Sequence, residues 1–169
     1  MKNLKRTLVL LLLVLPVCAS GPHAREQPGL YLSITETRTE HSRDSDSIVK
    51  TITVENGMLR SEETSRRRKP VHTQFKLSND EVSRLEALIR RNHLLDSSNV
   101  EGPERSGPHT SLDLSIKIRL KNKHSTIRIT GTAQTEELDT NLIYRRANEL
   151  LDALKDLVEG HHEGRTDAR

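Results

Sequence analysis

Leucine and isoleucine occupy every second position across residues 112–120, and polar residues occupy the positions between them. This alternation has the period of a β-strand that buries one face. Asn122-Lys123 interrupts the pattern, and Ile127 and Ile129 then resume it. The whole segment therefore predicts a β-hairpin near the centre of a sheet.

Three earlier stretches show the same alternation, at residues 30–35, 48–55 and 71–77. Asn56-Gly57 directly follows the second stretch, and this dipeptide favours the positive φ angles of a two-residue hairpin turn. We therefore expect the chain to fold back after it as a further strand. Residues 37–46 are polar and mixed in charge, which predicts a solvated loop.

Two other segments have helical periodicity. Ser78-Asn79-Asp80-Glu81 places a capping hydroxyl three residues before a glutamate, which predicts a helix start. The apolar residues of this helix fall on one stripe, and the helix should end near His93. The second segment runs from about residue 136 to residue 158, with Gly160 as its predicted stop.

These elements follow one another in the order β–ββ–β–α–ββ–α, which favours an α+β fold. We expect an antiparallel sheet of about five to six strands with two amphipathic helices packed on one face. Residues 29–159 should form this single domain. A flexible leader at 20–28 should precede it, and a disordered polar tail at 160–169 should follow it.

Residues 1–19 have the pattern of a secretory signal. Three basic residues, Lys2, Lys5 and Arg6, precede an unbroken apolar run at residues 8–15. The run is shorter than the about 20 apolar residues that a membrane-spanning helix needs. We therefore expect an exported protein that is periplasmic or extracellular.

Cys18, the only cysteine, lies at the end of this signal and has two interpretations. In the first, Val17-Cys18-Ala19 is a small-x-small cleavage site, and the cysteine leaves with the signal peptide. In the second, Leu15-Pro16-Val17-Cys18 resembles a bacterial lipobox, and Cys18 carries the lipid of a membrane-anchored lipoprotein. On either interpretation the domain has no internal disulfide.

Charge and aromatic content argue against several classes of ligand. The chain has 27 Lys and Arg residues against 24 Asp and Glu, and the signal holds three of the basic ones. The remainder is balanced in charge, which argues against a nucleic-acid surface. Tyr31, Phe75 and Tyr144 are the only aromatic residues, which argues against a pocket for flavin, haem or a nucleobase. We expect no cofactor, and membrane contact only through a lipid anchor.

The chain lacks the local motifs of common enzymes, such as G-x-S-x-G, a glycine-rich phosphate loop, H-E-x-x-H and C-x-x-C. Its eight histidines are scattered, and the one cluster, His161-His162-Glu163, reads as a solvated tail rather than a metal site. Glu136-Glu137 suits a helix start, where the dipole favours negative charge. We expect no enzymatic activity, and the remaining route to one is a Ser/His/Asp set assembled only by folding.

A basic cluster is the first candidate for binding. It consists of Arg66, Arg67, Arg68 and Lys69, which would suit an acidic protein, another acidic ligand or a lipid headgroup. A charged connector that only contacts solvent has the same composition, so both interpretations stay open.

A loop and an aromatic residue are the other candidates. The irregular segment 96–110 contains Gly102, Pro103, Gly107 and Pro108, and binding residues often lie on loops that a rigid sheet supports. The alternative is a variable connector. Tyr31 points away from the apolar face of its predicted strand, either as an exposed aromatic anchor or as cover for the far side of the sheet.

The succession of strands, the segment KLSNDEVSRLEALI at residues 76–89, the hairpin at 112–129 and the closing helix resemble the small bacterial emfourin-type inhibitors of metalloproteases. The resemblance is one of layout and covers about residues 30–158. It implies a protein that blocks a protease by surface binding. It assigns no inhibitory residue, because no specific motif matches.

These observations predict an exported, non-catalytic binding or structural protein of a Gram-negative-type bacterium. Its partner would be another protein or an envelope component, and the chain would act as a monomer. A secreted or periplasmic protease inhibitor is the first alternative, and a small hydrolase with a site that leaves no motif is the second.

Overall fold

Seven strands form one sheet in the computed structural model, which describes residues 29–41, 46–102 and 109–166. The strand order is β4-β3-β2-β1-β6-β7-β5. The strands are β1 (Tyr31–His41), β2 (Ser47–Glu55), β3 (Met58–Ser65), β4 (Val71–Lys76), β5 (Val100–Glu101), β6 (His109–Leu120) and β7 (Lys123–Thr132). Neighbouring strands are antiparallel except β5, which runs parallel to β7.

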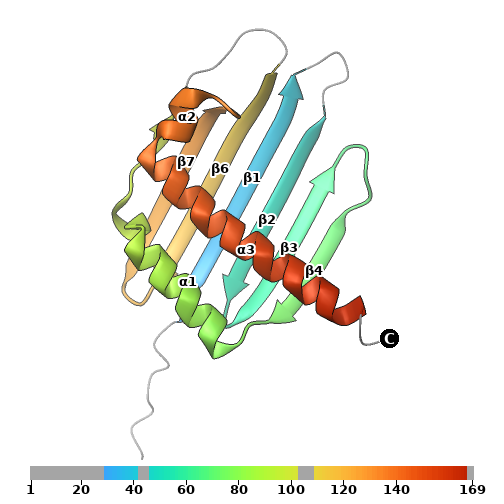
Figure 1. Ribbon diagram of the computed structural model, residues 1–169, viewed down its shortest axis with the longest axis vertical. Coiled ribbons are helices and arrows are strands. Elements are labelled where there is room, and N and C mark those ends of the chain that lie inside the picture. The colour runs from blue at the N-terminus through green and yellow to red at the C-terminus, as the bar shows by residue number, and fades with distance from the viewer. Residues whose placement is uncertain (1–28, 42–45, 103–108, 167–169) are drawn as a thin grey trace, which may run out of the picture.

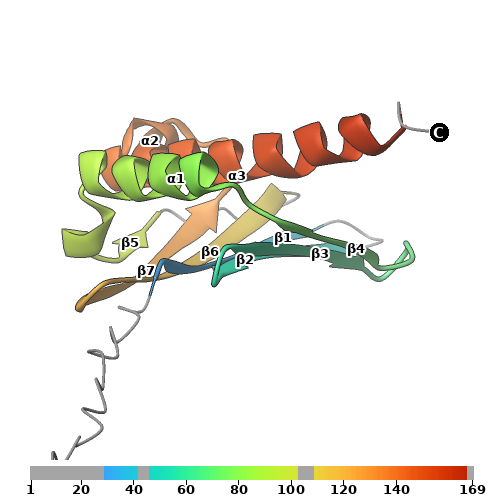
Figure 2. The ribbon, with the colours of Figure 1, turned by 90° about the horizontal axis from the view of Figure 1, so that it is seen from below.

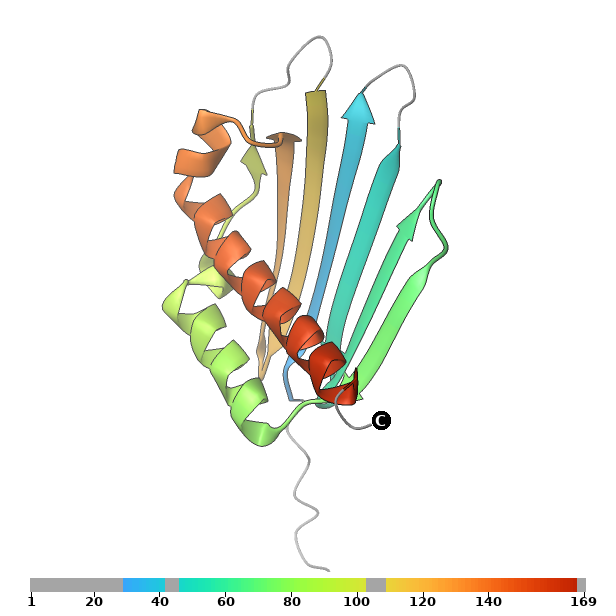
Figure 3. The same cartoon turned by 45° about the vertical axis from the view of Figure 1, so that its right-hand side comes forward.

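Three α-helices accompany the sheet in the described part of the chain: α1 (Asn79–Arg91), α2 (Glu136–Thr140) and α3 (Leu142–Thr166). All three lie on the same face of the sheet (Figures 1 and 2). The long helix α3 crosses the strands diagonally (Figure 3), and α1 lies beside residues 149–161 of it, with Arg91 next to Glu149 and Glu81 next to His161. The described residues therefore form a two-layer α+β structure, in which none of the described elements covers the opposite face of the sheet.

The core lies between the sheet and the helices, because every second residue of the central strands points toward α3. Leu32 and Ile34 on β1 pair with Ile118 and Ile116 on β6, and all four side chains are buried. The helices contribute mainly leucine, of which Leu150 and Leu154 are fully buried. Aliphatic side chains thus supply nearly all of the hydrophobic stabilisation.

Local signals set the ends of several elements. Asn56 and Gly57 have φ angles of 50° and 71°, and they form the turn between β2 and β3 as predicted. Ser78 and Glu81 form the predicted capping box at the start of α1. The C-cap of α1 is Asn92, and His93 follows it with φ 52°, close to the predicted end.

The prediction of a mixed α+β fold is confirmed, but several details of it are wrong. The sheet has seven strands instead of five or six, and it is not purely antiparallel. The extra strand β5 lies inside the segment 96–110, which we expected to be irregular. Strand β1 continues to His41, into residues that we expected to belong to a loop.

The closing helix also differs from the prediction. Asn141 divides it into α2 and α3, because its backbone is extended and its side-chain oxygen accepts the N–H groups of Ile143 and Tyr144. Gly160 does not stop α3, which continues to Thr166, so residues 160–166 are not the disordered tail that we expected. The predicted signal at residues 1–19, with Cys18, and the leader at 20–28 lie outside the described residues.

Candidate functional site

The side of the sheet that no described element covers, here called the outer face, is mainly polar, with Val49 and Met58 as apolar members. Side chains that pair across antiparallel strands share a face, so the register identifies its members. On β1 these are Tyr31 and every second residue after it, which are Ser33, Thr35, Thr37, Thr39 and His41. A broad, solvent-exposed platform of hydroxyl-bearing and charged residues results.

Four cations gather at one end of the outer face, here called the basic end: Arg60, Lys76, Lys117 and Arg119. Residues that are directly opposed on successive strands form a row across the sheet. The row of Tyr31 contains Arg119 on one side, and Glu55, Met58 and Lys76 on the other. The next row contains Ser33, Lys117 and Arg60. All four cations are exposed, and within the described residues none of them forms an ion pair.

Tyr31 stands at the centre of this group. The guanidinium carbon of Arg119 lies 5.3 Å from the centroid of the Tyr31 ring, which is a cation–π arrangement. The contact orders a large arginine side chain on an exposed surface without neutralising its charge. Tyrosine and arginine are also the residue types that most often dominate binding energy in protein interfaces.

Farther along the outer face, carboxylates balance the cations. Arg128 donates two hydrogen bonds to Asp113, at 3.2 Å from Nε and 2.6 Å from Nη2. This bidentate contact raises the pKa of Arg128, chiefly through the hydrogen bonds and then through the opposite charge. Glu62 lies 3.9 Å from His72. Unbalanced positive charge is therefore concentrated at the basic end, where Glu55 is the one acidic residue in the two rows.

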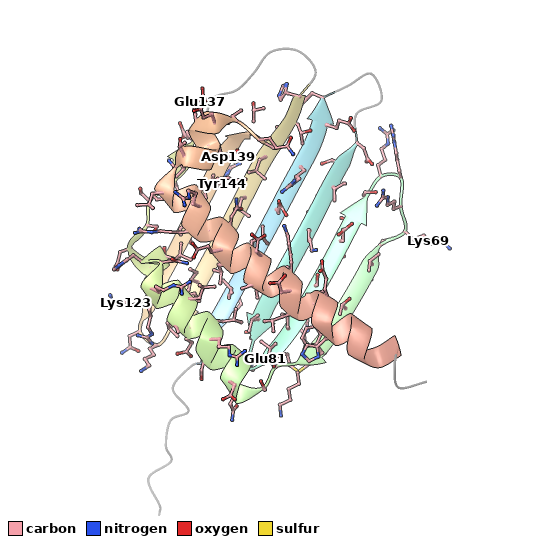
Figure 4. All side chains as sticks on the ribbon, in the orientation of Figure 1. Lys69, Glu81, Lys123, Glu137, Asp139 and Tyr144 are labelled. Atoms are coloured by element: carbon pink, nitrogen blue, oxygen red, sulfur yellow. The ribbon has the colours of Figure 1, made fainter. Side chains whose placement is uncertain are left out.

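The basic cluster predicted from the sequence is found elsewhere. Arg66, Arg67, Arg68 and Lys69 form the exposed turn between β3 and β4, and Figure 4 labels Lys69 at that turn. Strand β3 begins at Met58, in the row of Tyr31, and runs away from it to this turn. The structure therefore does not bring the cluster and Tyr31 together, and a binding role for the cluster stays a prediction.

Gly102, the described member of the predicted loop site, has a packing role. Its N–H donates to the Thr130 carbonyl at 2.6 Å, which continues the pairing of β5 with β7. A Cβ atom built on it would lie 3.1 Å from that same carbonyl oxygen. Pro103, Gly107 and Pro108 lie outside the described residues.

A hollow of about 400 Å³ on the outer face contains two histidines. His41 and His109 are directly opposed across β1 and β6, and their rings stack with centroids 4.5 Å apart. His41 Nε2 lies 3.1 Å from Ser111 Oγ, the distance that a serine nucleophile and its base require. The pair belongs to the far end of the outer face from Tyr31.

This serine–histidine pair lacks the other parts of a hydrolytic site among the described residues. The ring next to His41 is another imidazole rather than an orienting carboxylate. Ser111 lies inside β6, whose backbone is paired with β1 on one side and β7 on the other. Strand pairing therefore occupies the N–H groups that would stabilise an oxyanion.

A shallow groove of about 360 Å³ runs between α1 and α3 on the helical side. Leu85, Leu88, Ala153 and Leu157 form its floor, and Glu81, Arg84 and Asp156 form its rim. Glu81 is already engaged, because its Oε2 accepts from the Ser78 N–H at 2.6 Å and its Oε1 lies 3.2 Å from His161 Nε2. The hydrogen bonds from Ser78, followed by His161, lower the pKa of Glu81.

No three His, Cys, Asp or Glu side chains gather closely enough in the described ranges to hold a metal ion. In the same ranges, none of the helices combines the length and the apolar character that crossing a bilayer requires.

The sequence singles out Tyr31 as a candidate but gives no direct sign of the cations around it. Arg119 and Lys117 occupy the polar positions of the hairpin whose apolar positions we used to predict the core. Arg60 and Lys76 are on strands that were recognised without being aligned with β1. The alternation itself contains a signal. Each of these residues occupies a position of its strand that points away from the helices, so all of them belong to the same face.

No protein-family model matches the chain, and no curated protein matches it significantly.

Proposed function

We propose that this chain is an exported, non-catalytic binding protein that docks an acidic surface of a partner protein onto the basic end of its outer face. The partner would be a protein of the envelope or of the space outside it. Residues 1–19 would direct the export. They would then be removed, or cleavage before Cys18 would leave the chain tethered through a lipid on that cysteine.

The observation that carries the proposal is the cluster of Arg60, Lys76, Lys117 and Arg119 around Tyr31 on a sheet face that no described element covers. An aromatic residue surrounded by cations provides a contact that costs little conformational entropy to form, and the cations attract carboxylates over a long range. A rigid platform also loses little entropy when it binds, because strand pairing fixes its backbone, on both sides for β1, β3 and β6 and on one side for β4.

A protease inhibitor is the sharper version of this proposal, and it follows from the layout resemblance to the emfourin-type inhibitors. In that version, the acidic partner is a metalloprotease, and the basic end covers its surface. The hydrolase alternative has one supporting contact, between Ser111 and His41, and it lacks the orienting carboxylate and the oxyanion donors among the described residues.

The direct test immobilises the exported chain, passes an envelope extract over it and identifies the retained proteins by mass spectrometry. Tyr31→Ala and Arg119→Glu should abolish retention of the specific partner. Arg84→Glu is the matched control, because it reverses an exposed cation on α1, on the opposite side of the molecule. The proposal fails if the Arg119 variant retains the same proteins as the wild type, and a loss of these proteins only in the Arg84 variant would assign the contact to the helical side.

Two further measurements test the inhibitor version and the fate of Cys18. A panel of metalloproteases assayed with micromolar chain tests the inhibitor version, which is wrong if none of them is slowed. The intact mass of the exported product distinguishes simple cleavage from acylation, since a diacylglycerol on Cys18 would add a large and recognisable mass.

A further inference from the structure

Strand β4 is the longer of the two edge strands of the sheet. It pairs with β3 on one side, and no described strand pairs with it on the other. The opposite edge of the sheet is different, since β5 has only two residues. An unpaired edge presents backbone donors and acceptors to which another extended segment can bind.

The register identifies the residues whose backbone faces outward. The Leu77 N–H donates to the Gly57 carbonyl at 2.8 Å, and these two residues lie directly beyond Met58 and Lys76, the last pair of the β3–β4 ladder. Residues that exchange hydrogen bonds in an antiparallel pair recur at every second position. Phe75, Thr73 and Val71 therefore bond to β3, and the alternate residues are left for the edge.

Those alternate residues are His72, Gln74 and Lys76, and each directs an N–H and a C=O away from β3. Their side chains are exposed on the outer face, and Lys76 belongs to the basic end. The other side chains of β4 point to the helical side, where Val71 is 56% exposed and Phe75 is partly buried. The two sides of the edge thus differ sharply in chemistry.

An added strand would have to match both sides. Its side chains on the outer face would lie beside Lys76, with Arg60 beyond it, where carboxylates are favoured, and beside His72, which already faces Glu62. Its side chains on the helical side would lie beside Val71 and Phe75, where branched apolar residues are favoured. Because side chains alternate along a strand, the matching segment alternates acidic and apolar residues.

We propose that β4 receives an extended segment of the partner, with alternating acidic and apolar residues, which joins the sheet as an additional strand. This inference rests on the proposed function and adds to it the class of partner and its mode of binding. Main-chain hydrogen bonds to His72, Gln74 and Lys76 hold the segment, and the neighbouring basic end selects its charge.

The experiment uses the exported chain and the peptide acetyl-Glu-Val-Glu-Val-Glu-Val-Glu-amide, with a lysine-for-glutamate peptide as the charge control. Binding is measured by NMR titration, and amide hydrogen exchange is followed with and without the peptide. We expect the acidic peptide alone to bind, and to slow exchange at the amides of His72, Gln74 and Lys76.

Gln74→Pro is the decisive variant. It removes one outward N–H, and proline is tolerated at such positions of an edge strand because β3 loses no hydrogen bond. Gln74→Thr is the matched control, since it keeps the N–H but also loses the side-chain contact with Arg60 Nε. Gln74→Pro should weaken peptide binding by about tenfold or more, whereas Gln74→Thr should leave it nearly unchanged.

The outcomes separate this inference from the proposed function. If the peptide binds without protecting the three amides, and Arg119→Glu weakens it while Gln74→Pro does not, strand addition is wrong and docking on the basic end survives. Absence of peptide binding also overturns strand addition, and partner capture by the Tyr31 and Arg119 variants then decides the function separately. A dimer that Gln74→Pro dissolves would assign the edge to a second copy of the chain and would overturn the inference.

Discussion

Replacing Gly131 by alanine tests how β5 is held to the sheet. Gly131 is buried on β7 with φ 156°, a conformation that residues with a side chain rarely adopt. A Cβ atom on it would lie 3.1 Å from the Gly102 Cα and 3.3 Å from the Gly102 carbonyl carbon. Both contacts are with backbone, so the two segments would have to move apart.

The cost follows from three terms. A disfavoured backbone conformation costs about 1–3 kcal/mol. Separating the segments also weakens the 2.6 Å hydrogen bond from Gly102 to Thr130, which contributes about 1 kcal/mol. Alanine also restricts the unfolded chain more than glycine does, which stabilises the folded state by about 0.4–1 kcal/mol. We therefore expect Gly131→Ala to lower the free energy of unfolding by about 2–3 kcal/mol, a large share of the about 5–15 kcal/mol typical of a domain.

Two other glycines provide matched comparisons. A Cβ at Gly57 would meet no atom within 4 Å, but φ is 71°, so Gly57→Ala should cost only about 1 kcal/mol. Gly160 lies inside α3 with open space around it, so Gly160→Ala should stabilise the protein by about 0.5–1 kcal/mol. A destabilising Gly160→Ala would instead mean that the helix ends at that residue.

Urea unfolding followed by circular dichroism measures all three variants, since the chain has no tryptophan to report by fluorescence. Hydrogen exchange at Val100 and Glu101 should accelerate in Gly131→Ala and not in Gly57→Ala. If Gly131→Ala unfolds within about 0.5 kcal/mol of the wild type, the range of ordinary surface substitutions, the close approach of Gly131 to Gly102 does not hold β5 to the sheet.

Three further predictions concern the helices. Leu154→Ala should cost about 2–5 kcal/mol in urea unfolding because Leu154 is fully buried, whereas Leu142→Ala, at a residue 56% exposed, should change it little. Asn141→Ala should cost about 1 kcal/mol and speed hydrogen exchange at Ile143 and Tyr144, which its side chain caps. The pKa of Glu81 is lowered mainly by the hydrogen bonds from Ser78, so the ionised carboxylate stabilises the folded protein. This stabilisation should be complete above the usual pKa near 4.5, and it should be lost as the pH falls through the lower pKa of the folded state. The difference in urea midpoint between wild type and Glu81→Gln should therefore shrink on acidification, and an unchanged difference from neutral pH to pH 3 would contradict this origin.

The elements that the sequence predicted well are those that local chemistry determines. The capping box at Ser78 and Glu81 marks the start of α1, and Asn56-Gly57 marks a hairpin, because each signal acts within a few residues. The alternation in β6 predicted its buried face, because β6 is a central strand covered on one side only. Local and tertiary preferences agree at these positions.

The parts that were missed depend on contacts between distant residues. Strand β5 has two residues and no alternation to detect, and it exists because Gly102 and Gly131 allow two backbones to approach closely. Gly160 carries a helix-stop signal, yet α3 continues past it to His161, which stacks on Phe75 with ring centroids 3.9 Å apart. Tertiary packing overrides local propensity in both cases.

The basic end was missed for a related reason, because the sequence shows the phase of each strand but not the alignment between strands. Lys76, Arg60, Lys117 and Arg119 are separated by up to 59 positions in their numbering, from 60 to 119. Only the strand order β4-β3-β2-β1-β6 and its register bring them onto two adjacent rows. A balanced total charge therefore gave no indication of a locally basic surface.

The polarity of the outer face has a consequence for how a partner binds there. A face that packed permanently against another layer would carry alternating apolar residues, as the helical face does around Ile116 and Ile34. Hydroxyl groups and unpaired cations instead imply an association driven by charge, which salt weakens when charges lie farther apart than about 8–10 Å. The partner should consequently associate more slowly as ionic strength rises, and Arg119→Glu should reduce this salt dependence together with the association rate. A rate that salt does not change would show that the contact is mainly apolar and lies elsewhere, with the groove floored by Leu85 and Leu157 as the next surface to test.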